Sequence, residues 1–102
     1  METDILATEK PKTVKLADSK EYTLPPIDLT TLANIEKSMG FGLGRFAIKM
    51  EAEPMATMRA LVYALLKENH PGLTLEGVGH LITLKELSSL SETIAAIMAV
   101  SV

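Results

Sequence analysis

The stretch 53–72, EPMATMRALVYALLKENHPG, constrains the fold of this chain more than any other. Its apolar residues recur at steps of three and four, which places them on one face of a helix. Pro54 suits the first turn of that helix, Glu51 and Glu53 suit the positive end of its dipole, and HPG stops it. The residues of the apolar face are Met55, Met58, Leu61, Val62, Leu65 and Leu66. The pattern predicts a helix over about 54–69 whose apolar face must be covered by other elements.

A β-hairpin is predicted near the N-terminus, where KTVKL and EYTL alternate apolar and polar residues around ADSK. Val14 and Leu16 should share one face with Tyr22 and Leu24, and Leu16 is expected opposite Tyr22. That pairing requires a connection with an odd number of residues, three or five. The Pro-Pro pair that follows cannot donate hydrogen bonds to a neighbouring strand, so it ends the hairpin. Because a lone hairpin is only marginally stable, we expect it to lie against the helices.

Two further patterns predict shorter helices on either side of the long one. In IDLTTLANIEKSMG, Asp28 or Thr30 can cap the first amides, and Gly40 stands where a helix end favours a left-handed residue. This pattern predicts a helix over 28–39. The segment LTLEGVGHLI predicts another helix over 74–82, which begins with a threonine cap.

The last helix is predicted over 83–99, in TLKELSSLSETIAAIMAV, because Thr83 and Glu86 have the spacing of a capping box. Its apolar residues also recur at helical spacing. Together the patterns predict an α+β, mainly helical fold, in which an N-terminal β-hairpin at about 12–25 packs on a four-helix cluster.

Length and composition indicate a folded, acidic chain without cysteine. A length of 102 residues suits a single domain, expected over 12–102 and preceded by a flexible N-terminal arm at 1–11. The net charge of −3 argues against non-specific nucleic-acid binding, which requires clustered Lys and Arg. Without cysteine there is no disulfide framework. No apolar signal core is present, and no apolar run reaches the length of a membrane span, about 18 residues, so no membrane partner and a cytoplasmic setting are expected.

The stretch MGFGLGRF, at 39–46, joins the first two predicted helices and allows three interpretations. A nucleotide-binding loop would need Gly-Lys-Ser/Thr, or Gly-x-Gly-x-x-Gly after a strand, and neither pattern is present. The simplest interpretation is a flexible connection between helices. The third is a segment that offers apolar side chains to a partner, with Phe46 inclined toward the core and Phe41 toward exposure. The residues predicted for partner binding or self-association, here and in the following methionine-rich segment, are Phe41, Leu43, Phe46, Met50, Met55 and Met58.

No catalytic, cofactor-binding or metal-binding residue is predicted. His70 and His80 are the only histidines, and with no cysteine they do not complete a zinc site of three or four ligands. Ser19 follows an aspartate, as the modified serine of acyl carrier proteins does, but it lies in the predicted hairpin turn. Glu51 and Glu53 are explained as residues at a helix start, so they do not indicate an acid–base pair. The chain is therefore not expected to be an enzyme.

The order of these patterns resembles that of the small tail assembly chaperones of long-tailed bacteriophages and prophages. The resemblance is carried by KTVKLADSKEYTLPPIDLTTLANIEK at 12–37, by MRALVYALLKENHPGLTLEGVGHLI at 58–82 and by TLKELSSLSETIAAIM at 83–98. It covers nearly the whole chain except 1–11 and 39–53.

The resemblance implies a non-enzymatic role in phage tail assembly. Such chaperones bind the long, helical tape measure protein and keep it soluble in the host bacterial cytoplasm while tail tube subunits assemble, and they are absent from the mature virion. Relatives form homo-oligomers, and in many phages a ribosomal frameshift makes a longer product that recruits tail tube subunits, so this chain resembles the short form. Two features depart from the pattern. They are the glycine loop itself, and Gly77 and Gly79, where relatives usually carry helix formers such as Glu.

The implied helical client suggests two modes of association. An amphipathic helix exposes an apolar stripe, which an adaptable groove rich in Met and Leu can receive. The outer edge of the hairpin, expected to be unpaired, offers a second route through strand addition. The alternative function is a small structural adaptor or virion component of a phage tail or connector. A carrier protein modified on Ser19 is a third hypothesis.

Overall fold

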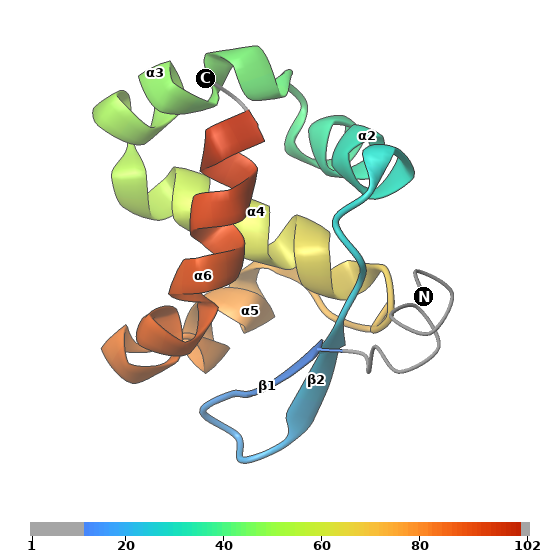
Figure 1. Ribbon diagram of the computed structural model, residues 1–102. Coiled ribbons are helices and arrows are strands. Elements are labelled where there is room, and N and C mark those ends of the chain that lie inside the picture. The colour runs from blue at the N-terminus through green and yellow to red at the C-terminus, as the bar shows by residue number, and fades with distance from the viewer. Residues whose placement is uncertain (1–11, 101–102) are drawn as a thin grey trace.

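The computed structural model describes residues 12–100 of the chain (Figure 1). Its elements are strands β1 (Lys12–Lys15) and β2 (Glu21–Leu24), helix α2 (Leu29–Met39), the 3₁₀ helix η1 (Leu43–Arg45), and helices α3 (Phe46–Ala52), α4 (Pro54–Lys67), α5 (Leu75–Leu81) and α6 (Leu84–Val100). The hairpin lies at one end of the molecule, and α2 and α3 lie at the other. This order confirms the predicted α+β, mainly helical fold with an N-terminal hairpin. The arm predicted at 1–11 falls outside the described residues.

Helix α4 lies at the centre of the hydrophobic core. It contacts α2, α3, α5 and strand β2, and its residues Leu61, Leu65 and Leu66 are completely buried. Helix α6 adds Leu90, also completely buried, to the same core. Most of the apolar face predicted for the long helix is therefore covered by the hairpin and the other helices, as expected, whereas Met55 stays exposed. The helix itself ends at Lys67, two residues before the predicted end.

The hairpin has the predicted buried face but not the predicted pairing. Val14 lies opposite Tyr22, and residues 16–20 form the connection. The expectation that Leu16 lies opposite Tyr22 is therefore wrong by two positions along one strand. Because side chains alternate between the two faces with a period of two, this shift still leaves Val14, Leu16, Tyr22 and Leu24 on the buried side. The face is fixed by the hydrophobic pattern, whereas the pairing depends on the geometry of the turn.

The turn is formed by Asp18 and Ser19, as predicted. Ser19 has a left-handed backbone with φ of 68°, and Oδ1 of Asp18 accepts a hydrogen bond from the backbone N–H of Lys20 at 3.0 Å. Oδ2 of Asp18 accepts a hydrogen bond from the hydroxyl of Tyr22 at 2.6 Å. This bond lowers the pKa of Asp18 and raises the pKa of Tyr22, because it stabilises the carboxylate and the protonated phenol together. The turn is thereby tied to the strand that follows it.

Helix α2 has the two ends that its sequence predicts. Asp28, rather than Thr30, caps the N-terminus, and its Oδ1 accepts a hydrogen bond from the backbone N–H of Thr31 at 2.8 Å. That hydrogen bond lowers the pKa of Asp28. Gly40 ends the helix in the left-handed region, with φ of 85°.

The segment between α2 and α4 contains more helix than predicted. Only residues 40–42 and residue 53 lack helical structure, because η1 and the seven-residue helix α3 fill the rest of the segment. The carboxylate of Glu36 accepts a hydrogen bond from the backbone N–H of Leu43 at 2.7 Å and ties the loop to α2. Glu51 lies in the last turn of α3, not at the start of α4, and Glu53 precedes α4 without a side-chain cap. The prediction missed α3 because seven residues give only a weak periodic signal.

Helices α5 and α6 begin and end within one residue of their predicted bounds. Their boundaries are marked in the sequence by capping residues, which explains the agreement. Within residues 12–100, no helix is both long enough and apolar enough to cross a lipid bilayer.

Candidate functional site

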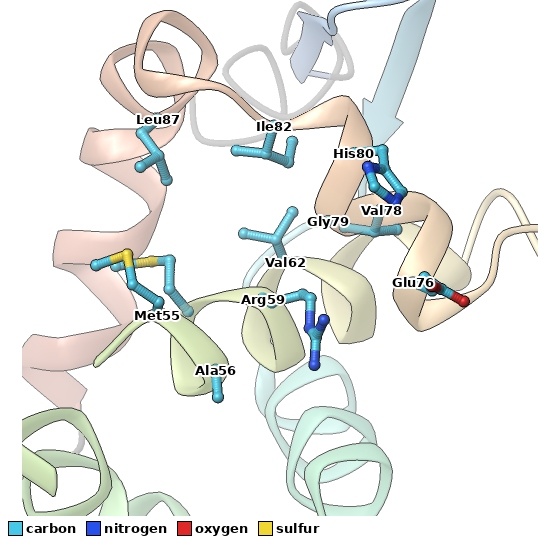
Figure 2. Close-up of a pocket in the computed structure, with 11 residues that line it drawn as sticks. Met55, Ala56, Arg59, Val62, Glu76, Val78, Gly79, His80, Ile82 and Leu87 are labelled. Carbon is cyan, nitrogen blue, oxygen red and sulfur yellow. The ribbon is translucent and has the colours of Figure 1, made fainter. Parts of the chain in front are cut away.

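A groove with a volume of about 550 Å³ lies between α4, α5 and the beginning of α6 (Figure 2). Figure 2 shows Met55 and Leu87 on one side of this groove, Glu76 and His80 on the other, and Val62 between them. The groove therefore has a mainly apolar side and a more polar side. Its lining residues are Met55, Ala56, Met58, Arg59, Val62, Glu76, Val78, Gly79, His80, Ile82 and Leu87.

Helix α4 supplies the floor and one rim of the groove. Val62 is buried at the floor, Met58 is half-buried, and Met55 is 68% exposed at the rim. Their spacing of three and four residues places them on one side of the helix, whereas Leu61 and Leu65 are completely buried in the core. The apolar face predicted from the sequence thus serves both the core and an open surface. The two methionines give that surface flexible side chains that adapt to different shapes.

Helix α5 forms the opposite wall, and its glycines allow two close contacts. The backbone N–H of Gly77 donates a hydrogen bond to the hydroxyl of Thr74 at 3.0 Å, and a Cβ at Gly77 would lie 2.9 Å from that oxygen. A Cβ at Gly79 would lie 2.9 Å from Cδ of Arg59. Glycine at 79 therefore lets the Arg59 side chain pass directly over α5. Both glycines, which depart from the expected pattern, have a packing reason in this chain.

Helix α6 begins with the predicted capping interaction, which also positions groove residues. Glu86 accepts hydrogen bonds from the backbone N–H of Thr83, at 2.8 Å, and from the Thr83 hydroxyl. The Glu86 side chain is only 6% exposed, and these bonds, the hydroxyl bond foremost, lower the pKa of its carboxyl. They fix the bend between α5 and α6, where Ile82 and Leu87 line the groove.

Three exposed ionisable side chains stand at the groove: Arg59, Glu76 and His80. Among residues 12–100, no carboxylate lies within 4.0 Å of the Arg59 guanidinium. In the same part of the chain, no group of three or more His, Asp or Glu side chains could hold a metal ion. An apolar floor bordered by charges is the arrangement that receives amphipathic helices in helix-in-groove recognition.

The residues predicted for partner binding do not form one surface. Met55 and Met58 come together in the groove. Leu43 and Phe46 are buried in the core, and Phe46 is only 1% exposed. The inclination of Phe46 toward the core is therefore confirmed, and neither of these two side chains is offered to a partner in this conformation.

Phe41 and Met50 occupy an intermediate position. Both are half-buried and pack against the core cluster. The Lys49 ammonium lies 5.4 Å from the centre of the Phe41 ring, within the range of a cation–π contact. Phe41 is thus less exposed than expected, because the helix α3 that follows the loop brings Lys49 over it.

The groove also contains residues that were not predicted to belong to a site. The sequence pattern indicates only helix or linker positions for Val78, Ile82 and Leu87. It indicates only a polar residue beside an apolar stripe for Arg59. The one available signal was Gly79, since a glycine inside a helical pattern often marks a close approach of another group. That signal does not identify the approaching side chain.

The outer edge of β2 is not free for strand addition. The backbone N–H of Thr23 donates to Nε2 of His70, and the side-chain amide of Asn69 donates to the Thr23 carbonyl at 3.1 Å. The expectation of an unpaired outer edge is therefore wrong at this strand. His70 also has a structural role that its position before a proline does not predict.

The fold and the groove define a small α+β protein with an open, mainly apolar surface between three helices. No protein family, no curated protein and no solved structure matches this chain. The groove and the order of the sequence patterns are therefore the two indications of its function.

Proposed function

We propose that this protein is a non-enzymatic tail assembly chaperone of a phage or prophage. It binds the helical tape measure protein in the groove between α4, α5 and α6, and keeps that protein soluble during tail assembly. It works in the host bacterial cytoplasm and is not retained in the mature virion. The observation that carries the proposal is the groove itself, in which the exposed Met55 and the half-buried Met58 stand above a floor of Val62 and Val78.

The chemistry of the groove suits a helical client. A long helical protein without its partners exposes apolar stripes, and methionine side chains adapt to stripes of differing shape. Full burial of one client leucine contributes about 1.5–3 kcal/mol, so a groove of this size holds a short segment weakly. Several copies acting together strengthen such binding through effective concentration. Weak binding at each single site is therefore compatible with a role as a homo-oligomer. In the same proposal, a longer frameshifted product recruits the tail tube subunits.

The test is co-expression with the long coiled-coil-rich protein encoded next to this chain. The soluble fraction of that protein should rise when the chain is present and fall back with Met55→Glu, which places a charge at the groove rim. Ile48→Glu is the matched control, because Ile48 is also 68% exposed but lies on α3 outside the groove. The control should keep the client soluble.

Two results would overturn the proposal. The first is a client that is equally insoluble with and without this chain. The second is retention of the chain in purified mature particles, which would instead support the small structural adaptor or virion component of a tail or connector.

A further inference from the structure

The charged rim of the groove is built around one arginine. Arg59 leaves α4 beside Val62 and passes over Gly79 of α5, where a Cβ would lie 2.9 Å from its Cδ and 3.8 Å from one of its terminal nitrogens. Any residue larger than glycine at 79 would displace this side chain. The arginine stem therefore lies close to α5, and Figure 2 shows the exposed guanidinium pointing away from Val62, Ile82 and Leu87.

This guanidinium has no acidic partner within the described part of the chain. No carboxylate of residues 12–100 lies within 4.0 Å of it. Glu76 lines the same groove, but Figure 2 shows its carboxylate and the Arg59 guanidinium pointing in different directions. The groove therefore presents a cation beside its apolar floor, and a separate carboxylate, that of Glu76, at another place on its rim.

We infer that Arg59, positioned by Gly79, selects client helices that carry an acidic residue beside their apolar stripe. The inference rests on the proposed function of the groove and names the kind of segment that it accepts. The guanidinium can pair with a carboxylate through two parallel hydrogen bonds, which a lysine does not match. Once a helix covers the groove and excludes water, this pair is stronger than a fully solvated one.

The preference for an acidic helix depends on the contact at Arg59 and not on the net charge of the chain. An acidic helix is repelled weakly by a protein of net negative charge, and salt screens that repulsion at a distance of about 10 Å. A correctly placed carboxylate gains the contact with Arg59, whereas a lysine at the same place meets a like charge. Charge contacts of this kind contribute to partner discrimination more than to total affinity.

The experiment uses two synthetic amphipathic peptides of about 20 residues, long enough to form helix in water. Both carry the same leucine stripe, which is flanked by glutamates in one peptide and by lysines in the other. Fluorescence anisotropy at low and high salt should show that the wild-type chain prefers the acidic peptide by about tenfold at low salt, with a smaller preference at high salt. Arg59→Gln should abolish the preference. Arg45→Gln, which removes the other arginine of the chain, should not.

The variant Gly79→Ala separates positioning from stability. Alanine is favoured over glycine inside a helix by about 1 kcal/mol, so the melting temperature should stay the same or rise. The preference for the acidic peptide should nevertheless shrink, because the new Cβ displaces the Arg59 stem. In the double variant Arg59→Gln/Gly79→Ala, the second change should have no further effect on the preference.

The outcomes distinguish the inference from the function on which it rests. Equal binding of both peptides by the wild type, or a preference that survives Arg59→Gln, overturns the selectivity and leaves the groove as a binding site. A preference that survives Gly79→Ala overturns the positioning role of the glycine. If the wild type binds neither peptide, and Met55→Glu leaves the solubility of the client unchanged in co-expression, the groove is not a helix-binding site and both proposals fall.

Discussion

The backbone N–H of Thr23 donates a hydrogen bond to Nε2 of His70 at 2.9 Å, across 47 positions of sequence. Nε2 accepts this bond only in the neutral imidazole, with the proton on Nδ1. The ring of His70 also meets the ring of Tyr22 edge-on, with centroids 4.8 Å apart. The middle of β2 is thus fixed to the segment that follows α4 through one backbone donor and one aromatic contact. Asn69 adds the matching bond to the Thr23 carbonyl.

Replacing His70 should loosen this attachment. His70→Ala leaves the Thr23 N–H without its acceptor, and we expect a loss of about 1–3 kcal/mol in the free energy of unfolding, measured in urea. His80→Ala is the control, because His80 is exposed and lies on α5. That variant should change stability by about 0.5 kcal/mol or less. Equal losses in the two histidine variants would contradict a specific role for the Thr23–His70 bond.

The carboxyl of Glu86 should make stability depend on pH. Its pKa is lowered in the folded chain by the hydroxyl and backbone N–H of Thr83, so the folded state binds this proton less readily than the unfolded state. The stabilisation is present above the ordinary pKa of the group, 4.5, and is lost as the pH falls through the lower folded value. Unfolding free energies measured at several pH values below 5 should therefore fall less steeply for Glu86→Gln than for the wild type.

The variant Thr83→Val gives the second half of this test. It removes the hydroxyl that lowers the Glu86 pKa most, and should also flatten the pH dependence. The double variant should show no further flattening beyond Glu86→Gln alone. Parallel pH curves for wild type and Glu86→Gln would contradict the prediction.

The two phenylalanines should differ in their contribution to stability. Phe46 is almost completely buried, so Phe46→Ala should cost about 3–5 kcal/mol through lost burial and the cavity that remains. Phe41 is half-buried, and Phe41→Ala should cost about 1 kcal/mol. The measurement is urea unfolding of the two variants side by side. Equal losses would show that the loop and α3 pack differently from this structure.

Much of the fold could be predicted from periodicity and end signals. The hydrophobic face of α4, the left-handed Gly40 and the Thr83–Glu86 pair were predicted from their residues and are present, and the cap of α2 falls on Asp28, one of its two predicted residues. These features depend on residues close in the sequence, so local chemistry is enough to predict them. The α3 helix was missed because its seven residues are stabilised mainly by their contact with α4.

The groove could be predicted only in part. Met55 and Met58 were candidates because they lie on an apolar stripe, but the stripe does not show which of its residues the core covers. The close contact of the Arg59 side chain with Gly79 joins α4 to α5. The hydrogen bond from Thr23 to His70 joins the hairpin to the segment that follows α4. Contacts between elements depend on how the helices cross, which no single segment of sequence determines.

The glycines after α2 should respond oppositely to substitution, because only one of them requires glycine. Gly40 has φ of 85°, and Gly44 has no positive φ, while an added Cβ meets nothing within 4 Å at either position. Gly40→Ala should therefore cost about 1–2 kcal/mol through backbone strain alone. Gly44→Ala should be neutral or stabilise by up to about 1 kcal/mol, since alanine restricts the unfolded chain. Thermal and urea unfolding of the two variants make the comparison. A similar loss in both would contradict the explanation that glycine is required only at the left-handed end of α2.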